Sequence, residues 1–561
     1  MPAGTEPADT EPATTPAVVR AAALRWPGAE ALVDGEVRMT FAQLGAEVER
    51  VAHALVATGL RPGDRVGIWA PNCWEWVITA LGTHAAGGVV VPLNTRYKGD
   101  EAAYILHRSG ARLLFTVRGF LGTDYPELLA GRATPIKRTV VFRSPSWDEF
   151  LRLADTDADA DTGGRAAGTL PEVNPDDLAD LLFTSGTTGR PKGVMTTHRQ
   201  TVSVPRAWAD VVGLRAGDRH LVVSPFFHTF GYRTGILADL IVGATTLPLA
   251  VVEVDTVLRL VSAERVTTLP GTPTLFQSIL DDPALTNPAA MSSAAGSPRA
   301  PDLHGAGHDL SSLRLSAVGA ASVPVELVLR MRAELFDVVV TGYGLTESTG
   351  VATMSRPDDP PEVVSRGVGR PLPGVEIQVV GPDGSPQPPG VAGEVLVRGH
   401  NVMSGYFDDP QETAAVIDAD GWLHTGDVGV LDDDGYLAIT DRLKDMYIVG
   451  GFNAYPAEIE AALLRHPGVA MAAVIGVPDR RLGEVGMAFL VRANGHSPNE
   501  EEIIAWCRTE MANYKVPRVL RFVDALPVNP VGKIVKPTLR NWATAPRAGA
   551  HTIRDDGHGR S

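Results

Sequence analysis

The sequence contains little cysteine and no long apolar run. Cys73 and Cys507 are its two cysteines among 561 residues, which excludes a disulfide framework and a thiolate metal cluster. No apolar run reaches the ~18 to 20 residues that a membrane span requires. The first residues, MPAGTEPADTEPATTP, are acidic and lack the apolar segment of a secretory signal. We therefore expect a cytoplasmic protein without a transmembrane segment.

The chain also contains fewer basic than acidic residues. The chain has 50 Lys and Arg against 66 Asp and Glu, a formal net charge of −16. It therefore offers no overall positive field that would attract nucleic acid or an anionic membrane, and an anionic substrate must be held by a local site. Hydrophobic residues make up 44% and charged residues 21% of the chain, as in ordinary globular proteins. The length predicts two or more domains.

Short apolar runs alternate with helical patterns from about residue 30, which is typical of α/β units. Thr40 and Gln43 predict a capping box at the start of a helix, whose apolar face carries Leu44, Val48, Val51 and Leu55. Residues 66–70 and 89–91 predict strands on either side of a helix that follows Asn72. This is a βαβ pattern.

The C-terminal part predicts a second, smaller α/β unit. DRLKDMYIVGG, at 441–451, is typical of a linker. Beyond it we expect a helix from Pro456 and a strand at 469–477. A later helix is expected to take its N-cap, N1 and N3 residues from Ser497, Pro498 and Glu500.

Three segments lack the pattern of packed structure. Residues 286–308 are rich in Ala, Ser, Pro and Gly and predict a flexible surface loop. Residues 1–15 and 543–561 predict disordered tails. We accordingly expect an N-terminal domain at 16–440 and a C-terminal domain at 441–542.

The strongest chemical signal is LLFTSGTTGRPKGV, at 181–194, where an apolar strand enters a loop of hydroxyl and glycine residues. Exposed backbone N–H groups, hydroxyls and the Lys192 cation together suit a polyphosphate. A Walker A loop requires Ser or Thr after its Gly-Lys pair, and here Gly193 follows Lys192. The P-loop interpretation therefore fails, and a polar hairpin is the structural alternative.

TSGTTGRPKG resembles the phosphate loop of the adenylate-forming superfamily, which includes acyl-CoA synthetases, luciferases and peptide-synthetase adenylation domains. Further motifs follow in the family's order over roughly residues 20–542: SPFFHTFG (224–231), GAASVP (319–324), TGYGLTE (341–347), GWLHTGD (421–427), DRLKDMYIVGG (441–451) and NPVGK (529–533). The resemblance implies a large N-terminal α/β domain of parallel and mixed sheets with helices, and a small mobile α+β C-terminal domain. It also implies an acid:CoA ligase that uses ATP, Mg²⁺ and CoA.

By this resemblance, Glu347 and Thr184 hold Mg²⁺, and Thr346 contacts the α-phosphate of ATP. Neutralising the charge on two repelling anions is the main catalytic task of such a site. The family's loop that cradles the departing pyrophosphate corresponds to Ser185, Gly186, Thr187, Thr188, Gly189 and Lys192. Without the motif, Glu347 would be interpreted as a solvated surface carboxylate.

The adenosine side of the implied site has three parts. Tyr343 stacks on adenine, and Gly319, Ala320 and Ala321 are small enough to let the backbone approach the base. Gly342 and Gly344, on either side of Tyr343, also belong to the implied ATP site. Asp427 accepts both ribose hydroxyls, with Arg442 as its partner. The structural alternatives are a core tyrosine and an ordinary Asp–Arg salt bridge.

The resemblance divides the remaining roles between two half reactions. Lys533 bridges the acid and the α-phosphate in adenylation, whereas Gly450 and Gly451 line the CoA tunnel in thioester formation. The C-terminal domain rotates between these steps about a hinge at Lys444. His228 corresponds to an aromatic gate at the acyl pocket, with a satisfied core histidine as the alternative. Without the motif, a lysine in a Pro- and Gly-rich segment would be interpreted as a solvated side chain. The role of Lys533 therefore rests on the motif.

Within the superfamily, four segments resemble the actinobacterial CoA ligases that act on the indanedione propionate left from sterol rings C and D. These are NTRY at 94–97, PFFHTFGY, LKDMYIVGGFNAYPAE and GVPDRRLGEVG. The expected acyl pocket is formed by the segment after His228, by residues 272–276 and by the chain around Gly319. A medium- or long-chain fatty acid is the alternative substrate, and an adenylate-binding protein without ligase activity is the alternative function.

Overall fold

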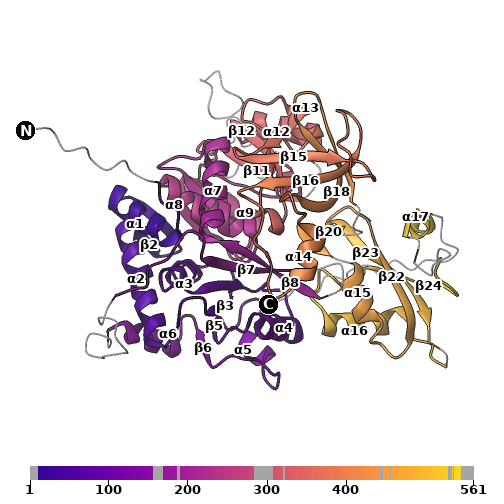
Figure 1. The fold of residues 1–561 in the computed structure, drawn as a ribbon, viewed down its shortest axis with the longest axis horizontal. Helices are drawn as coiled ribbons and strands as arrows, with labels where there is room; N and C mark the ends of the chain where they lie inside the picture. Colours follow the sequence, from indigo (N-terminus) through magenta and orange to yellow (C-terminus); the bar gives the residue numbers. More distant parts are fainter. Residues whose placement is uncertain are drawn as a thin grey trace, which may run out of the picture.

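A computed structural model gives the structure of the protein. It describes residues 11–155, 169–185, 190–282, 308–319, 323–442, 447–454, 456–493, 495–527, 534 and 536–544. Most of the predicted loop at 286–308, most of the N-terminal tail and nearly all of the C-terminal tail lie outside these residues. Figure 1 shows a large N-terminal body and a small C-terminal body on its right-hand side. This confirms the predicted fold class of a large domain with mixed sheets and a smaller C-terminal domain.

A seven-stranded sheet forms the first layer of the large domain. Its order is β17-β8-β7-β4-β3-β5-β6. The strands from β7 to β6 run parallel, β8 is antiparallel to β7, and β17 is antiparallel to β8. The bounds are β3 Arg65–Trp69, β4 Val89–Pro92, β5 Leu113–Thr116, β6 Arg138–Val141, β7 Leu178–Ser185, β8 Pro191–Thr197 and β17 Gly405–Tyr406. The predicted βαβ pattern is confirmed as β3, α3 (Trp74–Ala85) and β4.

A second sheet lies beside the first and has the order β2-β1-β10-β9, followed by β11 and β12. Single bridges at Thr268, to His220 and to Leu315, join its two parts. The bounds are β1 Glu30–Asp34, β2 Val37–Thr40, β9 Arg219–Val222, β10 Thr245–Pro248, β11 Leu315–Val318 and β12 Val338–Tyr343. A third sheet is antiparallel: β15 Val375–Val380, β16 Gly393–Gly399, β18 Leu423–Leu431 and β19 Leu437–Arg442. Two short strands, β13 Thr353–Met354 and β14 Arg370–Pro371, extend β12.

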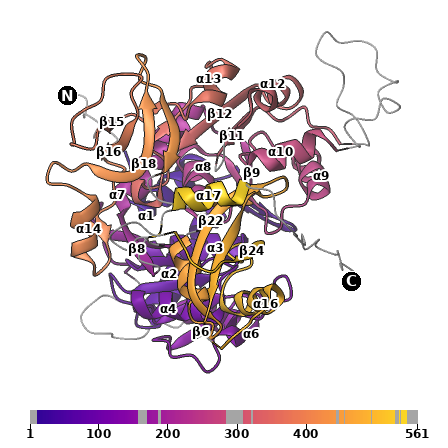
Figure 2. The same cartoon turned by 90° about the vertical axis from the view of Figure 1, so that its right-hand side faces the viewer.

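Helices cover the sheets of the large domain (Figures 1 and 2). Their bounds are α1 Thr15–Arg25, α2 Phe41–Ala57, α4 Gly99–Ser109, α5 Tyr125–Leu128, α6 Pro145–Arg152, α7 His198–Val212, the π-helix η2 Phe230–Leu237, α8 Ala238–Val242, α9 Val254–Glu264, α10 Pro273–Leu280, α12 Val325–Glu334, α13 Pro361–Arg366 and α14 Pro410–Val416. Short 3₁₀ helices lie at η1 Leu153–Asp155 and η5 Thr346–Ser348.

Helix α2 shows how the sequence pattern becomes packing. Thr40 and Gln43 form the predicted capping box, and the predicted apolar face, which includes Leu44, Val48 and Leu55, is buried. A Cβ on Gly82 of α3 would lie 2.6 Å from Cγ1 of Val51, so α3 can approach α2 because residue 82 has no side chain. The two helices share the largest apolar cluster among the described residues.

The N-terminal tail is shorter than predicted. Thr14 and Thr15, which we expected in the tail, are buried, and the hydroxyl of Thr14 caps α1 by accepting from the N–H of Ala17. The cap satisfies one of the free N–H groups at the start of the helix.

In the part of the small domain that the structure describes, a five-stranded sheet is accompanied by three helices. The bounds are β20 Tyr447–Val449, β21 Phe452–Ala454, β22 Val469–Asp479, β23 Gly483–Arg492, β24 Val519–Phe522, α15 Pro456–Leu463, α16 Glu500–Glu510 and α17 Lys536–Thr544. The predicted start of α16 is wrong: its N-cap is Asn499, not Ser497. Asn499 and Glu502 each accept from the other's backbone N–H, and this capping box outweighs the Ser-Pro signal.

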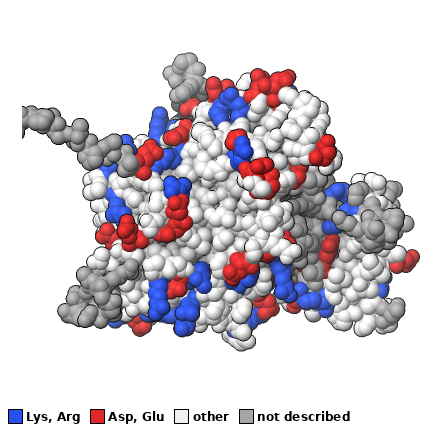
Figure 3. All heavy atoms as spheres, viewed as in Figure 1, with Lys and Arg blue, Asp and Glu red and all other residues white. Residues whose placement is uncertain are grey.

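The surface of the described residues carries charges of both signs, as the composition predicts. On the face shown in Figure 3, basic and acidic side chains are interspersed around an area with few charges. In the part of the chain that the structure describes, no helix is both long and apolar enough to cross a membrane.

Candidate active site

Glu347 lies where three distant segments of the large domain meet. It belongs to η5, just after β12. The hydroxyl of Tyr406, on β17, donates to Oε1 of Glu347 at 2.9 Å, and the hydroxyl of Thr184, on β7, donates to the same oxygen at 3.5 Å. The structure thus brings together the two residues predicted to hold a metal ion. It adds Tyr406, which the sequence motifs did not indicate.

A carboxylate beside a hydroxyl suits a hard cation such as Mg²⁺. Among the described residues, no group of three or more His, Cys, Asp or Glu side chains gathers to hold a metal ion. A cation at Glu347 would therefore need phosphate oxygens and water to complete its coordination, as Mg²⁺ commonly does beside nucleotides. The residues present fit such a cation.

Lys192 lies opposite Thr184 across the antiparallel pair β7–β8. Its ammonium group forms an ion pair with Glu412 of α14 and lies 5.0 Å from the centre of the Tyr406 ring. Its side chain is 10% exposed. The flanking strands form a hairpin, as in the structural alternative, and they hold Lys192 near Glu347. The rest of the predicted phosphate loop lies outside the described residues: Gly186, Thr187, Thr188, Gly189 and the side chain of Ser185.

Tyr343 and Asp427, predicted to contact adenine and ribose, lie in direct contact. The hydroxyl of Tyr343 donates to Oδ2 of Asp427 at 2.7 Å. Asp427 is 4% exposed, and its N–H donates to the hydroxyl of Thr425. The contact joins β12 of the second sheet to β18 of the third. Arg442 pairs with Asp427 in the backbone register of β18 and β19, but its side chain lies outside the described residues.

The small residues of the adenosine side have different surroundings. A Cβ on Gly319 would meet none of the described atoms within 4 Å. A Cβ on Gly344 would lie 2.4 Å from the carbonyl oxygen of Gly350, so a side chain cannot be placed there. Gly342 is likewise enclosed, with Cε of Met354 at 2.6 Å. Thr346 lies in η5 beside Glu347, whereas Ala320 and Ala321 lie outside the described residues.

The glycine pair of the small domain reaches the large domain. Gly450 and Gly451 form the turn between β20 and β21, with φ of 55° and 86°, a region that favours glycine. A Cβ on Gly451 would lie 3.3 Å from Cγ2 of Thr272, the N-cap of α10. Thr272 begins one of the segments expected to form the acyl pocket. Lys444 and Lys533, the predicted hinge and adenylation residues, lie outside the described residues.

A buried lysine joins the two domains beside this turn. The ammonium group of Lys515 donates to Glu101 of α4 and to Glu458 of α15, each at 2.6 Å, and its side chain is 1% exposed. Burial opposes its charge, but neighbouring Tyr514, Glu458, Glu101 and Tyr97 raise the pKa of Lys515 well above its ordinary value. Sequence motifs did not indicate Lys515.

Aromatic contacts surround the same interface. The guanidinium group of Arg96 lies 4.4 Å from the centre of the Phe452 ring, and the rings of Phe452 and Tyr514 stack at 4.9 Å. Arg96 comes from the large domain and the two rings from the small domain. These contacts and the lysine cluster hold the glycine pair against Thr272.

His228 lies in the segment between β9 and η2. Its imidazole is exposed, and its Nδ1 accepts from the N–H of Phe230 at 3.4 Å. Residues of β9 and η2 pack closely next to this segment and leave no space for a water molecule between them. The acyl pocket formed by the segment after His228 and the gate role of His228 both stay predictions.

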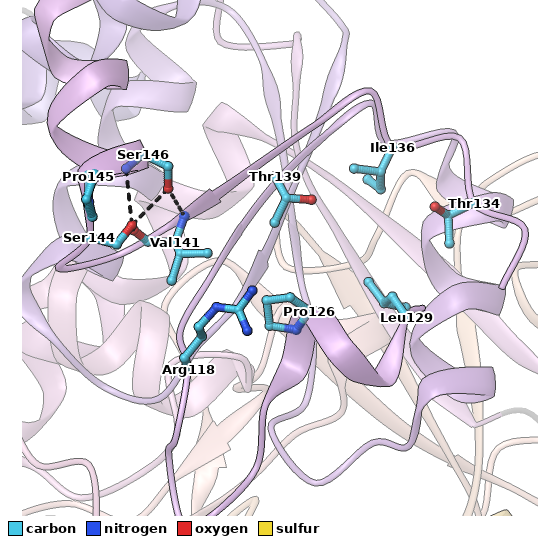
Figure 4. A pocket seen from close by; sticks show the side chains of 10 residues that line it. All are labelled: Arg118, Pro126, Leu129, Thr134, Ile136, Thr139, Val141, Ser144, Pro145 and Ser146. Carbon is cyan, nitrogen blue, oxygen red and sulfur yellow. Dashed lines mark hydrogen bonds between the residues drawn. The ribbon is translucent and has the colours of Figure 1, made fainter. Parts of the chain in front are cut away.

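A hollow of about 550 Å³ lies at the far edge of the first sheet, between α5, β6 and α6 (Figure 4). Its lining contains Arg118, which forms an ion pair with Asp124. Two further lining residues, Ser144 and Ser146, hydrogen bond to each other. None of the predicted site residues lines it, so it is not the candidate active site.

Comparison with known families identifies the class of the protein. Residues 19–407 match the AMP-binding enzyme family, and residues 458–533 match the AMP-binding enzyme C-terminal domain. The chain belongs to this family of adenylate-forming acyl-CoA synthetases, which use ATP and CoA as cosubstrates. The resemblance seen in the sequence is thereby confirmed. The predicted boundary at residue 440 lies between the two matches, and its position stays a prediction.

Among individual relatives, similarity is high to a protein of Rhodococcus jostii (strain RHA1) named 3-[(3aS,4S,7aS)-7a-methyl-1,5-dioxo-octahydro-1H-inden-4-yl]propanoyl:CoA ligase. The two are 49% identical over 538 residues, which cover 94% of this chain and 98% of the relative. The long-chain-fatty-acid–CoA ligase FadD13 of Mycobacterium tuberculosis (strain ATCC 25618 / H37Rv) is 34% identical over 516 residues, 91% of this chain and 95% of the relative.

Two solved structures of one relative, o-succinylbenzoate CoA synthetase (MenE) from Bacillus subtilis, differ in their likeness to this structure. The complex of a double mutant with the product analogue OSB-NCoA has a TM-score of 0.79 at 30% identity, covering 93% of this chain and 98% of that chain. The complex with the acyl-adenylate OSB-AMP has a TM-score of 0.64 at 30% identity, covering 95% and 99%. By this measure the present structure is more similar to the product-analogue complex.

Proposed function

We propose that this chain joins the bicyclic dione acid, 3-(7a-methyl-1,5-dioxo-octahydroinden-4-yl)propanoate, to CoA. The observation that carries the substrate is the 49% identity over 94% of the chain to a ligase named for that acyl group. The fatty-acid alternative has weaker support, because the fatty-acid ligase is 34% identical. Sterol rings C and D are the proposed origin of the acid, and a cytoplasmic setting stays a prediction.

The first half reaction joins the acid to AMP. The carboxylate oxygen attacks the α-phosphorus of ATP, and the bond from that phosphorus to pyrophosphate breaks. Lys192 and the proposed phosphate loop bind the departing pyrophosphate, and Lys533 bridges the acid and the α-phosphate. Tyr343 and Asp427 position the adenosine, with Arg442 as the proposed partner of Asp427.

Mg²⁺ would be held by Glu347 and Thr184, and when bound it would neutralise charge on the phosphates. The 2.9 Å hydrogen bond from Tyr406 fixes one oxygen of Glu347, so the carboxylate is oriented before nucleotide arrives. This reduces the reorganisation needed when the cation and nucleotide bind.

The second half reaction transfers the acyl group to sulfur. The CoA thiol loses its proton and attacks the acyl carbon, and AMP leaves with the electrons of the broken C–O bond. Gly450 and Gly451 line the path of the pantetheine arm in this proposal, because their turn meets Thr272 without side chains in the way. Both cysteines are buried, which agrees with an intermediate that is not attached to the protein.

Pyrophosphate release with ATP and Mg²⁺ over a panel of carboxylic acids, with and without CoA, tests the proposal. The panel contains the bicyclic dione acid, octanoate and palmitate, and the thioester is identified by mass. We expect release with the dione acid to exceed release with either alkanoate, and a CoA adduct of the dione acid. Faster turnover of palmitate would overturn the substrate, and release without any CoA adduct would favour the adenylate-only alternative.

A further inference from the structure

Lys192, the cation predicted to bind pyrophosphate, is held by a carboxylate that no sequence motif indicated. Its ammonium group forms an ion pair with Oε2 of Glu412, on α14. The Lys192 side chain is 10% exposed, and that of Glu412 is 34% exposed. The pair is therefore partly shielded from water, where opposite charges attract more strongly than at an open surface.

The ring of Tyr406 lies against the same ammonium group. Its centre is 5.0 Å from Nζ of Lys192, a distance at which an aromatic ring attracts a cation. The Tyr406 hydroxyl donates to Oε1 of Glu347 at 2.9 Å. Tyr406 thus connects Lys192 to the carboxylate proposed to hold Mg²⁺, and Glu412 is a second carboxylate close to the proposed phosphate site.

The backbone places Glu412 beside Lys192. Strand β17 pairs with β8, and Tyr406 lies opposite Val194, two residues after Lys192. Asp409 then caps α14 by accepting from the N–H of Glu412 at 3.2 Å. This cap uses the backbone of Glu412 and not its carboxylate. The carboxylate can therefore leave Lys192 without loss of the cap.

A phosphate that binds Lys192 competes with Glu412 for one cation. An ammonium group has three donors and can contact both anions, but the two anions then repel each other. Alternatively, the partly exposed carboxylate turns toward water as the phosphate takes its place. In both cases Glu412 lowers the affinity of the site for phosphate. Glu347 differs, because its charge is offset by the Mg²⁺ that it is proposed to hold.

We propose that Glu412 competes with pyrophosphate for Lys192 and so promotes release of this product once the acyl-adenylate has formed. This inference rests on the proposed function, in which Lys192 binds the departing pyrophosphate. While pyrophosphate stays bound, it can attack the acyl-adenylate and re-form ATP, so its release commits the enzyme to the second half reaction. Glu412 is a positioning residue, because it acts on the phosphates through Lys192.

Binding of inorganic pyrophosphate in the presence of Mg²⁺, measured by isothermal titration calorimetry, tests this role. Glu412→Gln removes the charge but keeps the length and helix propensity of the side chain, so α14 should form. Asp408→Asn is the matched control. Asp408 lies in the same segment but pairs with Arg108, and its φ of 50° is one that Asn tolerates. Lys192→Met tests the cation itself.

We expect Glu412→Gln to bind pyrophosphate about three- to tenfold more tightly, the effect of removing one competing carboxylate from a partly exposed ion pair. Pyrophosphate should also inhibit adenylation by this variant at a correspondingly lower concentration. Asp408→Asn should bind pyrophosphate as wild type does. A structural defect would weaken binding, so a gain in affinity is specific to the proposed role.

Unchanged or weaker binding by Glu412→Gln would overturn the inference, and so would an equal gain in Asp408→Asn. In the Lys192→Met background, Glu412→Gln should gain at most about twofold, because the cation for which the anions compete is gone; the full gain there would also overturn it. Lys192→Met that binds pyrophosphate as tightly as wild type would instead overturn the role of Lys192 in the proposed function. The measurement needs no acid, so it is independent of the proposed substrate.

Discussion

The nucleotide side of the site and the side facing the glycine pair differ in which domains supply their contacts. Glu347, Tyr406, Tyr343 and Asp427 all belong to the large domain and are linked by hydrogen bonds within it. The glycine turn meets Thr272 from the other domain, and Lys515 joins the two bodies. The acidic groups proposed to serve ATP are therefore held within the large domain alone, whereas the proposed thiol side depends on contacts between the two domains.

This difference predicts that the two half reactions can be impaired separately. The structure has a higher TM-score to the product-analogue complex of MenE than to its acyl-adenylate complex. Substitutions of Glu347 or Asp427, which lie in the large domain, should slow adenylation without changing the domain orientation. Substitutions at the domain interface should act mainly through the fraction of molecules in the thioester-forming orientation.

The largest effect is expected for Lys533→Ala. Loss of the cation that bridges the acid and the α-phosphate should slow adenylation at least about 10³-fold, at the upper end for removal of one charge-stabilising group. Thioester formation from supplied acyl-adenylate should be spared. The two steps are followed separately by pyrophosphate release and by thioester mass, and equal loss of both would break the division between the regions.

Glu347→Gln should slow adenylation by about 10²- to 10³-fold, because the amide has the shape of the carboxylate without its charge for Mg²⁺. Tyr406→Phe is the matched control: it removes one hydrogen bond to Glu347 and should cost only about fivefold. Both are measured by pyrophosphate release at saturating acid, with Mg²⁺ varied. A Glu347→Gln enzyme within fivefold of wild type would contradict the assigned role.

Glu101→Gln sharpens the comparison at the interface. It weakens the bond that Lys515 makes to the large domain but leaves Glu458 to neutralise the buried cation, so folding should survive. We expect thioester formation from supplied acyl-adenylate to slow about tenfold, the effect of roughly 1.4 kcal/mol on the orientation equilibrium. Glu458→Gln, within the small domain, should have the smaller effect because the interdomain ion pair remains.

Acid pH should weaken the large domain gradually. Burial, with nearby His84, lowers the pKa of His198 to about 3 from an ordinary value of 6.5. Between these values the unfolded chain binds a proton that the folded chain does not, so the free energy of unfolding falls as pH is lowered from 6.5 toward 3. His198→Gln should reduce this slope by up to ~1.4 kcal/mol per pH unit. Unfolding followed by tryptophan fluorescence at several pH values measures it, and an unchanged slope would contradict the assignment.

Local signals in the sequence were sufficient for much of the fold. Thr40 and Gln43 predicted the cap of α2, and the alternation of apolar runs predicted the βαβ unit, because both depend on neighbours along the chain. The N-cap of α16 was misplaced because Ser497 and Asn499 are both good caps two residues apart, and only the reciprocal bond to Glu502 decides between them.

The residues that the sequence did not indicate make contacts between distant segments. Lys515 and Glu101 are 414 positions apart, and Tyr406 and Glu347 are 59 apart. Motifs located Glu347 and Asp427 but not the side chains that orient them. Lys515 lies between Tyr514 and Val516 in a segment with few charges. This placement was the signal in the sequence that could have predicted a buried cation.

Thioester formation from the supplied acyl-adenylate of the dione acid, with CoA and without ATP, tests the account most directly. The account predicts that wild-type enzyme forms the thioester and releases AMP. It also predicts that Glu101→Gln forms the thioester about tenfold more slowly while its pyrophosphate release from ATP stays within twofold of wild type. No thioester from wild-type enzyme, or an equal slowing of both steps in Glu101→Gln, would contradict it.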